Sequence, residues 1–280
     1  MNLTDKVIAV TGGGSGIGAA MCHRFAAENP RSLVVMDLNG SAAERTATQI
    51  SESHPSLAVY SAALDVSNES ELLKALDQIQ ARDGVIDLFV GNAGIGSGVG
   101  VEGTNDIWRS VIDVNLMAHV YAARALVPTW LERGEGYMLI TASAAGLLTN
   151  LGDAPYSVTK HGAVALAEWL SVTYGHRGIG VSCLCPQGVR TPLLFPEGEA
   201  DGDLSEREAL ALNVVRAQRI LEPTEVAETV VESLRSEQFL ILPHPEVHDY
   251  EVARATDRER WLATMRRIQS HLDPASGADQ

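Results

Sequence analysis

"KVIAVTGGGSGIG", residues 6–18, decides the fold of this 280-residue chain. The apolar run at 7–10 has the length of one strand, and a glycine-rich turn separates it from a helical pattern. Glycine lets the backbone turn tightly and approach a pyrophosphate, whose charge the free amides of a helix N-terminus can meet. The spacing is T-G-x-x-x-G-x-G through Gly12, Gly16 and Gly18, not G-x-G-x-x-G. We expect a dinucleotide site at this turn.

Similar β-branched runs recur along the chain, with helical patterns between them. They occupy residues 6–10, 32–37, 57–65, 86–91, 137–143, 180–186 and 239–243. Strands that alternate with helices build a parallel sheet covered on both faces, and continuously apolar strands fit such a sheet because both of their faces are buried. No internal repeat or long linker divides the chain. The pattern predicts one Rossmann-type, doubly wound α/β domain over 1–280, with strand order 3-2-1-4-5-6-7.

The end of the second expected strand favours NAD as the dinucleotide. Asp37 follows the glycine turn by about twenty residues, where a carboxylate can hold both ribose hydroxyls. A 2′-phosphate there would need a nearby cation, but the turn and the residues after the strand carry none. These residues are Gly13, Gly14, Ser15, Leu38 and Asn39. We therefore expect NAD to be preferred over NADP.

The overall charge narrows the class of partner. Lys and Arg number 21 against 36 Asp and Glu, so the formal net charge is −15. Such a charge repels phosphate backbones and anionic membrane surfaces, which argues against nucleic acid and membranes as partners. The apolar run at 7–10 is too short for a signal-peptide core, and no run approaches a bilayer-spanning length. We expect a cytoplasmic protein.

Cysteines and histidines give no metal signal. Cys22, Cys183 and Cys185 include no C-x-x-C pair and are expected as buried, reduced thiols. His244 and His248 are four residues apart, but a proline lies between them and no cysteine is near. We predict no metal site.

Two segments interrupt the alternation of strands and helices. Residues 190–221 are rich in Gly, Pro and acids before a helical pattern, and we expect a substrate lid there, with a plain surface loop as the alternative. Residues 243–280 form a C-terminal extension with a Pro-bounded turn and a helix. Its apolar stripe favours packing or an oligomer contact over a cofactor site; the stripe consists of Trp261, Leu262, Met265 and Ile268.

The pentapeptide "YSVTK" at 156–160 sets Tyr156 and Lys160 one helical turn apart at the start of an expected helix. Residues i and i+4 share a helix face, so the phenol and the ammonium can lie side by side. Taken alone, the pair is better explained as an exposed, solubilising face. Neighbouring motifs have to decide.

Taken in order, the motifs resemble those of the short-chain dehydrogenase/reductase family from residue 6 to about residue 242. They are the T-G-x-x-x-G-x-G turn, "NAG" at 92–94, Asn115, Ser143 and the Y-x-x-x-K of Tyr156 and Lys160. The resemblance implies that Asn115, Ser143, Tyr156 and Lys160 form a catalytic tetrad. It also implies cofactor contacts along the strand ends, with Asp65 and Val66 beside the adenine. The implied cofactor-binding set is Gly12, Ser15, Gly16, Ile17, Gly18, Asp37, Asp65, Val66, Asn92, Ala93, Gly94, Tyr156, Lys160, Pro186, Gly188, Val189 and Thr191.

Two positions depart from the family pattern. Gly91 precedes Asn92 where the family usually has a second asparagine, and we expect this change to alter packing only. Gln187, in "PQGVRT" at 186–191, stands in the glycine place of the family's P-G-x-V-x-T. We therefore do not carry over the family's local backbone geometry beside the nicotinamide, and we expect that Gln187 can place an amide side chain near the substrate.

The chemistry implied by the resemblance is reversible hydride transfer between NAD and a secondary alcohol. The alkoxide that forms when a ketone is reduced must receive a proton, which Tyr156 would supply, with Lys160 lowering the pKa of the phenol. Ser143 would hold the carbonyl oxygen, and Asn115 would kink its helix and hold a water that links Lys160 to solvent. The alternative is a non-catalytic NAD(H)-binding regulator on the same fold. Relatives that epimerise or dehydrate usually carry a T-G-x-x-G-x-x-G turn, which this chain lacks.

The sequence indicates the substrate class and the oligomeric state less directly than the reaction. Leucines at 147, 148, 193 and 194 and a phenylalanine at 195 could wall an apolar pocket for an aliphatic, cyclic or steroid-like alcohol, or could belong to the core. The predicted substrate contacts are Ser143, Leu147, Tyr156, Gln187 and Phe195. The family also implies a homodimer or homotetramer built on two long helices near 105–132 and 155–174.

Overall fold

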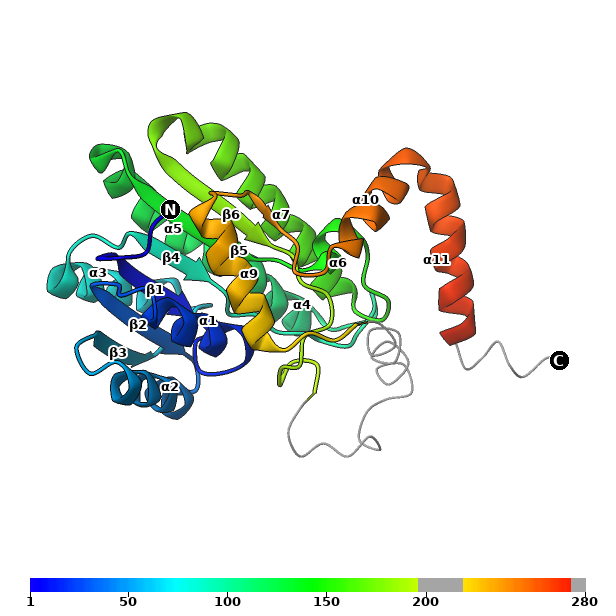
Figure 1. Ribbon diagram of the computed structural model, residues 1–280. Helices are drawn as coiled ribbons and strands as arrows, with labels where there is room; N and C mark the ends of the chain where they lie inside the picture. The colour runs from blue at the N-terminus through cyan, green and yellow to red at the C-terminus, as the bar shows by residue number, and fades with distance from the viewer. Residues whose placement is uncertain (196–218, 273–280) are drawn as a thin grey trace.

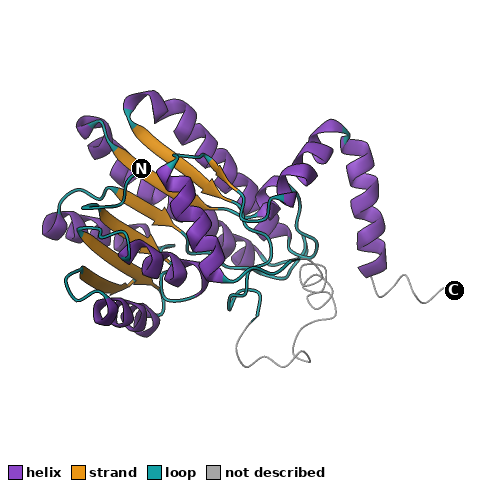
Figure 2. Ribbon diagram, in the orientation of Figure 1, coloured by secondary structure: helices purple, strands orange, loops and turns teal. Residues whose placement is uncertain are grey.

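The structure is a computed structural model that describes residues 1–195 and 219–272. A seven-stranded sheet forms the centre of this part, and each neighbouring pair of strands runs parallel (Figure 2). The strand order is β3-β2-β1-β4-β5-β6-β7. The expected doubly wound α/β class and the expected order are confirmed.

Each expected strand is present, and the differences lie at the ends. The strands are β1 (Val7–Thr11), β2 (Ser32–Asp37), β3 (Ala58–Ala63), β4 (Leu88–Gly91), β5 (Gly136–Thr141), β6 (Ile179–Leu184) and β7 (Leu240–Ile241). β3 lies at the edge of the sheet and is only partly covered, so the expectation of continuous burial is wrong for this strand. β5 ends at Thr141, so Ser143 does not close the strand as expected but caps the helix that follows.

Helices cover both faces of the sheet (Figure 1). One face carries α1 (Gly16–Ala26), α2 (Gly40–Ser53) and α9 (Pro223–Arg235). The other carries α3 (Glu69–Asp83), α4 (Asn105–Ile112), α5 (Ala118–Arg133) and α7 (Ala154–Tyr174). Shorter or peripheral elements are the π-helical η1 (Asp113–Met117), α6 (Ala144–Leu147), the 3-10 turn η2 (Gly175–Arg177), α10 (Glu246–Thr256) and α11 (Arg258–Leu272). Helices thus occupy both regions where long helices were expected.

β1 shows why the sheet is buried on both sides. Val7 and Ala9 join the hydrophobic cluster under α3, α5 and α7, whereas Ile8 and Val10 join the cluster under α1, α2 and α9. Successive side chains of a strand point to opposite faces, so four consecutive apolar residues serve two cores. Burial of one such side chain contributes roughly 1.5–3 kcal/mol. The run at 7–10 therefore holds β1 in the middle of the molecule.

The expected lid can be followed only at its two ends. Val189 pairs with Leu221 in an isolated parallel bridge, and the Arg190 N–H donates to the Leu221 carbonyl at 2.9 Å. The start and the end of the 190–221 segment therefore lie side by side. Residues 196–218, on which most of the lid expectation falls, lie outside the described residues.

The C-terminal extension contains two helices, α10 and α11, where one was expected. Figure 1 shows α10 leaving the sheet and α11 extending beyond it. Trp261 packs against the core, whereas Leu262 is 37% exposed, so the expected apolar stripe is only partly covered. Residues 273–280 lie outside the described residues. No helix in the described ranges is both long enough and apolar enough to cross a membrane.

Candidate active site

The glycine turn links β1 to α1 at the carboxyl edge of the sheet. Gly12 and Gly16 have φ values of 63° and 51°, in the left-handed region that favours glycine. A Cβ atom at Gly18 would overlap the Gly12 carbonyl oxygen, so the turn and the helix touch through bare backbone. Within the described chain, the N-cap Ser15 makes no side-chain bond to the first turn of α1. The three glycines of the motif are therefore required by geometry.

Asp37 closes β2 and faces this turn. Its Oδ2 accepts the Gly14 N–H at 2.9 Å, and its Oδ1 accepts the Asn39 N–H at 2.9 Å. A carboxylate oxygen can accept more than one hydrogen bond, so each oxygen keeps capacity for a ligand hydroxyl. Leu38, the next residue, is 74% exposed. The carboxylate is thus held in place beside the turn.

Asn92 joins three strand ends where the strand order reverses between β1 and β4. Its Nδ2 donates to the carbonyls of Thr11 and Gly12 at 3.2 and 3.3 Å, and its Oδ1 accepts from Thr141 Oγ1 at 3.2 Å. Thr11 Oγ1 accepts the N–H groups of Asn92 and Ala93 at 2.9 and 3.1 Å. These bonds fix β1, β4 and β5 together at the place where doubly wound sheets bind their ligands.

Tyr156 and Lys160 lie on the first turns of α7. Asp153 Oδ1 accepts the Tyr156 N–H at 3.0 Å and caps the helix. Lys160 Nζ lies 5.5 Å from the centroid of the Tyr156 ring and donates to the Thr141 carbonyl at 2.9 Å. Lys160 is only 3% exposed. The explanation as an exposed, solubilising pair is therefore wrong.

Ser143 lies two residues after the end of β5 and close to Tyr156. It caps α6, and its Oγ accepts the Ala145 N–H at 3.1 Å. The Ser143 side chain also lies close enough to the Tyr156 phenol to lower the pKa of Tyr156. Two hydroxyl groups thus lie together at the carboxyl edge of the sheet.

Asn115 lies in η1, the π-helical segment between α4 and α5, as expected of a kink in the helix. Its Oδ1 accepts the Ile95 N–H at 2.8 Å, and its Nδ2 donates to the Ile95 carbonyl at 2.9 Å and to Thr159 Oγ1 at 3.3 Å. A Cβ atom at Gly94 would come within 3.3 Å of Lys160 Nζ and 3.4 Å of Asn115 Oδ1. The structure thus brings all four side chains of the expected tetrad to one place.

Sequence comparison extends the similarity over most of the chain. The sequence model of the family described as short chain dehydrogenase matches residues 6–201. This chain belongs to the short-chain dehydrogenase/reductase family. The resemblance drawn from the motifs is confirmed, and the protein is an oxidoreductase of this family.

Individual short-chain dehydrogenases align over long stretches. The 1-deoxy-11-beta-hydroxypentalenate dehydrogenase of Streptomyces exfoliatus is 35% identical over 219 residues, covering 73% of this chain and 76% of that one. The meso-2,3-butanediol dehydrogenase of Serratia marcescens is 30% identical over 230 residues, covering 81% and 86%. The crystal structure of a family member from Burkholderia phymatum in complex with NAD has a TM-score of 0.83 at 28% identity and covers 92% and 96%.

The electrostatics of this short-chain dehydrogenase are dominated by burial. Burial raises the pKa of Tyr156 and outweighs the hydrogen bond with Ser143, which lowers it. Burial also lowers the pKa of Lys160 to about 8, against the opposing effect of Cys183 and Cys185. The expectation that Lys160 lowers the pKa of the phenol stays a prediction, because it also counts on the positive charge of a bound oxidised nicotinamide. Among the protein's own groups, the loss of solvent around the phenol is the larger effect.

Sequence motifs missed His119, which lies one helical turn after Asn115 and is buried. A Cβ atom at Gly91 would overlap His119 Nδ1 and come within 2.9 Å of its Cε1. Glycine in place of the usual asparagine therefore makes room for an imidazole. Burial, reinforced by the charge of Lys160, lowers the pKa of His119 to about 3, so the ring is neutral. The unusual Gly91 was the available signal for a bulky partner nearby.

Asp153 was also missed. Besides capping α7, its Oδ1 accepts from Ser97 Oγ at 2.7 Å, and its Oδ2 accepts the N–H groups of Ser97 and Gly98 at 2.6 and 2.9 Å. It therefore ties the loop after β4 to the start of the helix that carries Tyr156. An aspartate two residues before Pro155 is a common helix N-terminus pattern, which would have identified it.

The segment 186–191 closes the site behind Ser143. The Pro186 carbonyl accepts the Ala144 N–H at 2.9 Å and the Ser143 hydroxyl at 3.5 Å. At the other end, a Cβ atom at Gly16 would come within 2.9 Å of Thr191 Cγ2, so Thr191 lies against the glycine turn. Gly188 and Val189 between them are buried.

The remaining predicted residues are spread around this centre. Asp65 follows β3 and accepts the N–H and the hydroxyl of Ser67 at 2.9 and 2.7 Å, and Val66 is buried. Ile17 packs against the core under α1. Among the predicted substrate residues, Leu147 is buried in the hydrophobic cluster under α3, α5 and α7. The Phe195 ring lies 5.2 Å from the Arg190 guanidinium. Of the other proposed wall residues, Leu148 belongs to that cluster and Leu193 is 54% exposed.

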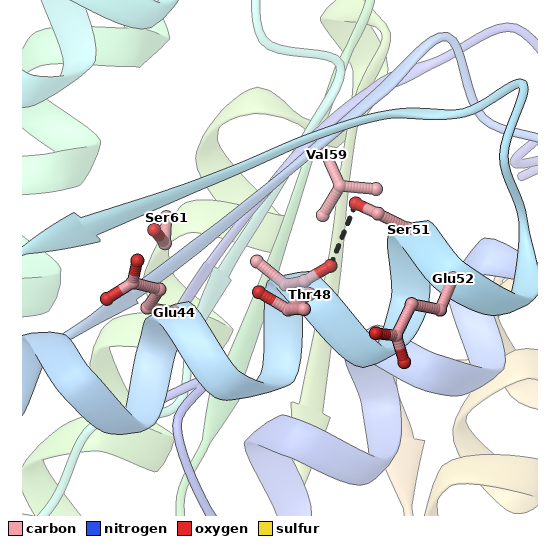
Figure 3. Close-up of a pocket in the computed structure, with 7 residues that line it drawn as sticks. Glu44, Thr48, Ser51, Glu52, Val59 and Ser61 are labelled. Carbon is pink, nitrogen blue, oxygen red and sulfur yellow. Dashed lines mark hydrogen bonds between the residues drawn. The ribbon is translucent and has the colours of Figure 1, made fainter.

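A groove between α2 and β3 is separate from these residues (Figure 3). Its lining consists of Glu44, Ala47, Thr48, Ser51, Glu52, Val59 and Ser61. Ser51 Oγ donates to the Ala47 carbonyl at 2.9 Å, the bond drawn in the figure. None of the predicted site residues lines this groove. The predicted catalytic residues lie instead at the carboxyl edge of the sheet.

Proposed function

We propose that the protein is an NAD-dependent oxidoreductase that interconverts a secondary alcohol and a ketone through Asn115, Ser143, Tyr156 and Lys160. The observation that carries the proposal is the Tyr156 phenol beside the Ser143 side chain, with buried Lys160 Nζ 5.5 Å from the Tyr156 ring. A proton donor, an oxygen-binding hydroxyl and a cation are the groups that carbonyl reduction requires.

Each residue has a defined task in this mechanism. In reduction, the neutral Tyr156 donates its proton to the developing alkoxide, and in oxidation its phenolate takes the proton back. Ser143 donates a hydrogen bond to the same oxygen and fixes its position. Lys160 stabilises the phenolate by charge, which opposes the effect of burial. Asn115 holds the backbone of Ile95 and thereby positions the loop after β4, which passes beside Lys160 at Gly94.

The glycine turn and Asp37 are the residues proposed to hold NAD, which supplies or accepts the hydride when bound. A Cβ atom at Gly18 would fill the space beside the Gly12 carbonyl, and the amides at the start of α1 suit a pyrophosphate. Asp37 would accept hydrogen bonds from the ribose hydroxyls and repel a 2′-phosphate. The related B. phymatum protein was crystallised with NAD, which supports the same choice here.

The proposal also covers the substrate class, the cellular location and the oligomeric state. Two relatives are named for hydroxylated compounds, 1-deoxy-11-beta-hydroxypentalenate and 2,3-butanediol, which supports an alcohol as substrate. Leu193 and Phe195 provide apolar surface near the site. With a net charge of −15, the protein suits the cytoplasm and has no attraction to nucleic acid. We place it there as a homodimer or homotetramer.

A panel of secondary alcohols with NAD, followed at the NADH absorbance, tests this function. Turnover is expected for the parent, and Tyr156→Phe should lose most of it while still binding NADH, because only the proton donor is removed. Near-parent activity in Tyr156→Phe would contradict the catalytic assignment. Tight NADH binding without turnover of any alcohol would instead favour the non-catalytic regulator.

A further inference from the structure

We propose that the Gln187 amide binds a second hydroxyl of the substrate, next to the one that is oxidised, so that the protein prefers a vicinal diol to a simple alcohol. This inference rests on the proposed function and narrows its substrate class. It concerns the position where the family pattern P-G-x-V-x-T has glycine and this chain has a glutamine.

The first observation is an enclosed polar atom without a partner. Gln187 Oε1 is buried and accepts no hydrogen bond from any described residue. An unsatisfied buried acceptor costs about 1–3 kcal/mol, which a hydrogen-bond donor from a bound molecule would recover. A hydroxyl group supplies such a donor, and a hydrocarbon does not.

The second observation is that the backbone of Gln187 is held from both sides. The peptide between Pro186 and Gln187 is trans, so its carbonyl and its N–H point in opposite directions. The carbonyl accepts from the Ala144 N–H and the Ser143 hydroxyl. The Gln187 N–H donates to His244 Nδ1 at 3.2 Å. The peptide plane is therefore held by hydrogen bonds on both sides, and the amide side chain starts one residue from the contact with Ser143.

His244 acts as a positioning residue in this arrangement. The ring is fully buried, its Nδ1 accepts from Gln187, and its Nε2 donates to the Arg219 carbonyl at 3.1 Å. This pattern requires the neutral ring, and burial lowers the pKa of His244 in agreement with it. His244 thus links the segment after β6, the segment after β7 and the residues before α9.

Ser143 defines where the substrate lies relative to this amide. Its hydroxyl is the group proposed to bind the reacting oxygen, and it also contacts the Pro186 carbonyl. A hydroxyl on the carbon next to the reacting one lies within a few ångströms of the reacting oxygen, the separation over which one residue extends. A vicinal diol or hydroxyketone therefore matches the pair formed by Ser143 and Gln187.

The test compares matched substrates with saturating NAD: 2,3-butanediol against 2-butanol, and 1,2-cyclohexanediol against cyclohexanol, with mixed stereoisomers. The parent should show a higher kcat/KM for each diol. Gln187→Leu keeps the bulk of the side chain but removes its hydrogen bonds, and should lower the diol-to-alcohol ratio about tenfold or more, mainly through KM. NADH affinity is measured by fluorescence for the parent and for Gln187→Leu, to show whether the substitution affects cofactor binding.

His244 provides the second arm of the test. His244→Phe should lower the same ratio, whereas His244→Asn, whose side chain keeps an acceptor near the position of Nδ1, should restore much of it. An unchanged ratio in Gln187→Leu, with turnover of both substrates, would overturn the inference and leave the proposed function standing. A parallel loss of NADH affinity would show that the amide serves the cofactor, and would also overturn it. If the parent oxidises another secondary alcohol of the panel but neither diol, the inference is overturned and the proposed function stands.

Discussion

Lys160 carries a charge that is expected to titrate within the ordinary working range of an enzyme. Its pKa is about 8 because it is buried. The ammonium is present below that pH and lost above it, so the charge that we propose to hold the cofactor ribose and to stabilise the Tyr156 phenolate disappears as the pH rises. We predict that NADH affinity weakens by up to about tenfold between pH 7 and pH 9, because the charged fraction of Lys160 falls by about that factor and a hydrogen bond to a charged group is lost with it. Fluorescence titration of NADH across this range measures it.

Lys160→Met is the control for this pH dependence. The variant should bind NADH weakly and with the same affinity at pH 7 and pH 9, because it has no charge to lose. If the parent's affinity does not change through pH 8, the ammonium has no part in cofactor binding.

Asp37, at the end of β2, is the residue proposed to set the choice of cofactor. Its carboxylate faces the turn through Gly14, and no Lys or Arg lies within the turn or just after β2. We predict a preference for NAD over NADP on the order of a hundredfold in kcat/KM, equivalent to a few kcal/mol. Asp37→Ala combined with Leu38→Arg should shift this preference toward NADP, and Leu38→Arg alone should shift it less. Equal use of both cofactors by the parent would mean that Asp37 does not contact the ribose.

At the scale of single residues, a sequence predicts a site residue when the chemistry requires a particular residue type at a particular spacing. Tyr156 and Lys160 are separated by one helical turn because their groups must share a face, and a motif records that. The environment of a group is a different matter. The raised pKa of Tyr156 and the neutral ring of His119 depend on burial by segments distant in sequence, which no local pattern encodes.

At the scale of elements, the strands could be predicted and their ends could not. A central strand such as β1 is apolar throughout, which gives a clear signal, but β3 at the edge has mixed composition. The break between α10 and α11 follows from Asp257, whose Oδ1 accepts the Arg260 N–H at 2.9 Å and so starts a new helix. This capping bond explains why the extension contains two helices and not the one that was expected.

The contact between the glycine turn and α1 gives a prediction for an element. A methyl group at Gly18 would overlap the Gly12 carbonyl, so Gly18→Ala must push the helix away from the turn. We predict a loss of roughly 1–3 kcal/mol in unfolding free energy, the usual cost of overpacking, together with weaker NADH binding. Denaturant unfolding and NADH titration measure the two effects.

Gly175 provides a matched control for that substitution. Nothing in the described structure lies within 4 Å of a Cβ atom placed there, and its φ of −56° suits alanine. Gly175→Ala should leave NADH binding unchanged and stability equal or slightly higher. If Gly18→Ala behaves like Gly175→Ala, the turn and the helix do not need their close contact.

At the scale of the whole molecule, the exposed side of α7 bears on the proposed assembly. Val158, Trp169 and Val172 are 54%, 55% and 82% exposed and share one face of the helix. We predict a dimer or tetramer by light scattering, and a shift toward monomer in Trp169→Glu because a charge would enter the contact. Leu38→Glu, at an apolar position that is 74% exposed and lies between β2 and α2, should keep the parent mass. A monomeric parent would contradict the assembly.

Fold class and strand order could be predicted because alternation of strands and helices leaves few topologies. The course of α10 and α11 could not, since it depends on contacts such as that of Trp261 with the core. The same holds for the stability of the molecule in acid, which depends on which histidines the fold buries.

His119 should dominate the change of that stability with pH. Its pKa is about 3 in the folded protein, against about 6.5 in the unfolded chain. Between these values the unfolded chain binds more protons, so the unfolding free energy falls as the pH drops below about 6.5, by up to ~1.4 kcal/mol per pH unit. This amounts to about 2 kcal/mol at pH 5. Denaturant unfolding of the parent at pH 7 and pH 5 measures the loss.

His119→Leu isolates this contribution, because the variant keeps an apolar side chain in the space left by Gly91 and has no imidazole to protonate. The loss between pH 7 and pH 5 should shrink by about 2 kcal/mol relative to the parent. Burial lowers the pKa of His23 and His244 as well, so only the difference between the two proteins reports on His119. His176→Leu, at an exposed histidine, should retain the parent's loss. An equal loss in His119→Leu would mean that the imidazole reaches solvent in the folded protein.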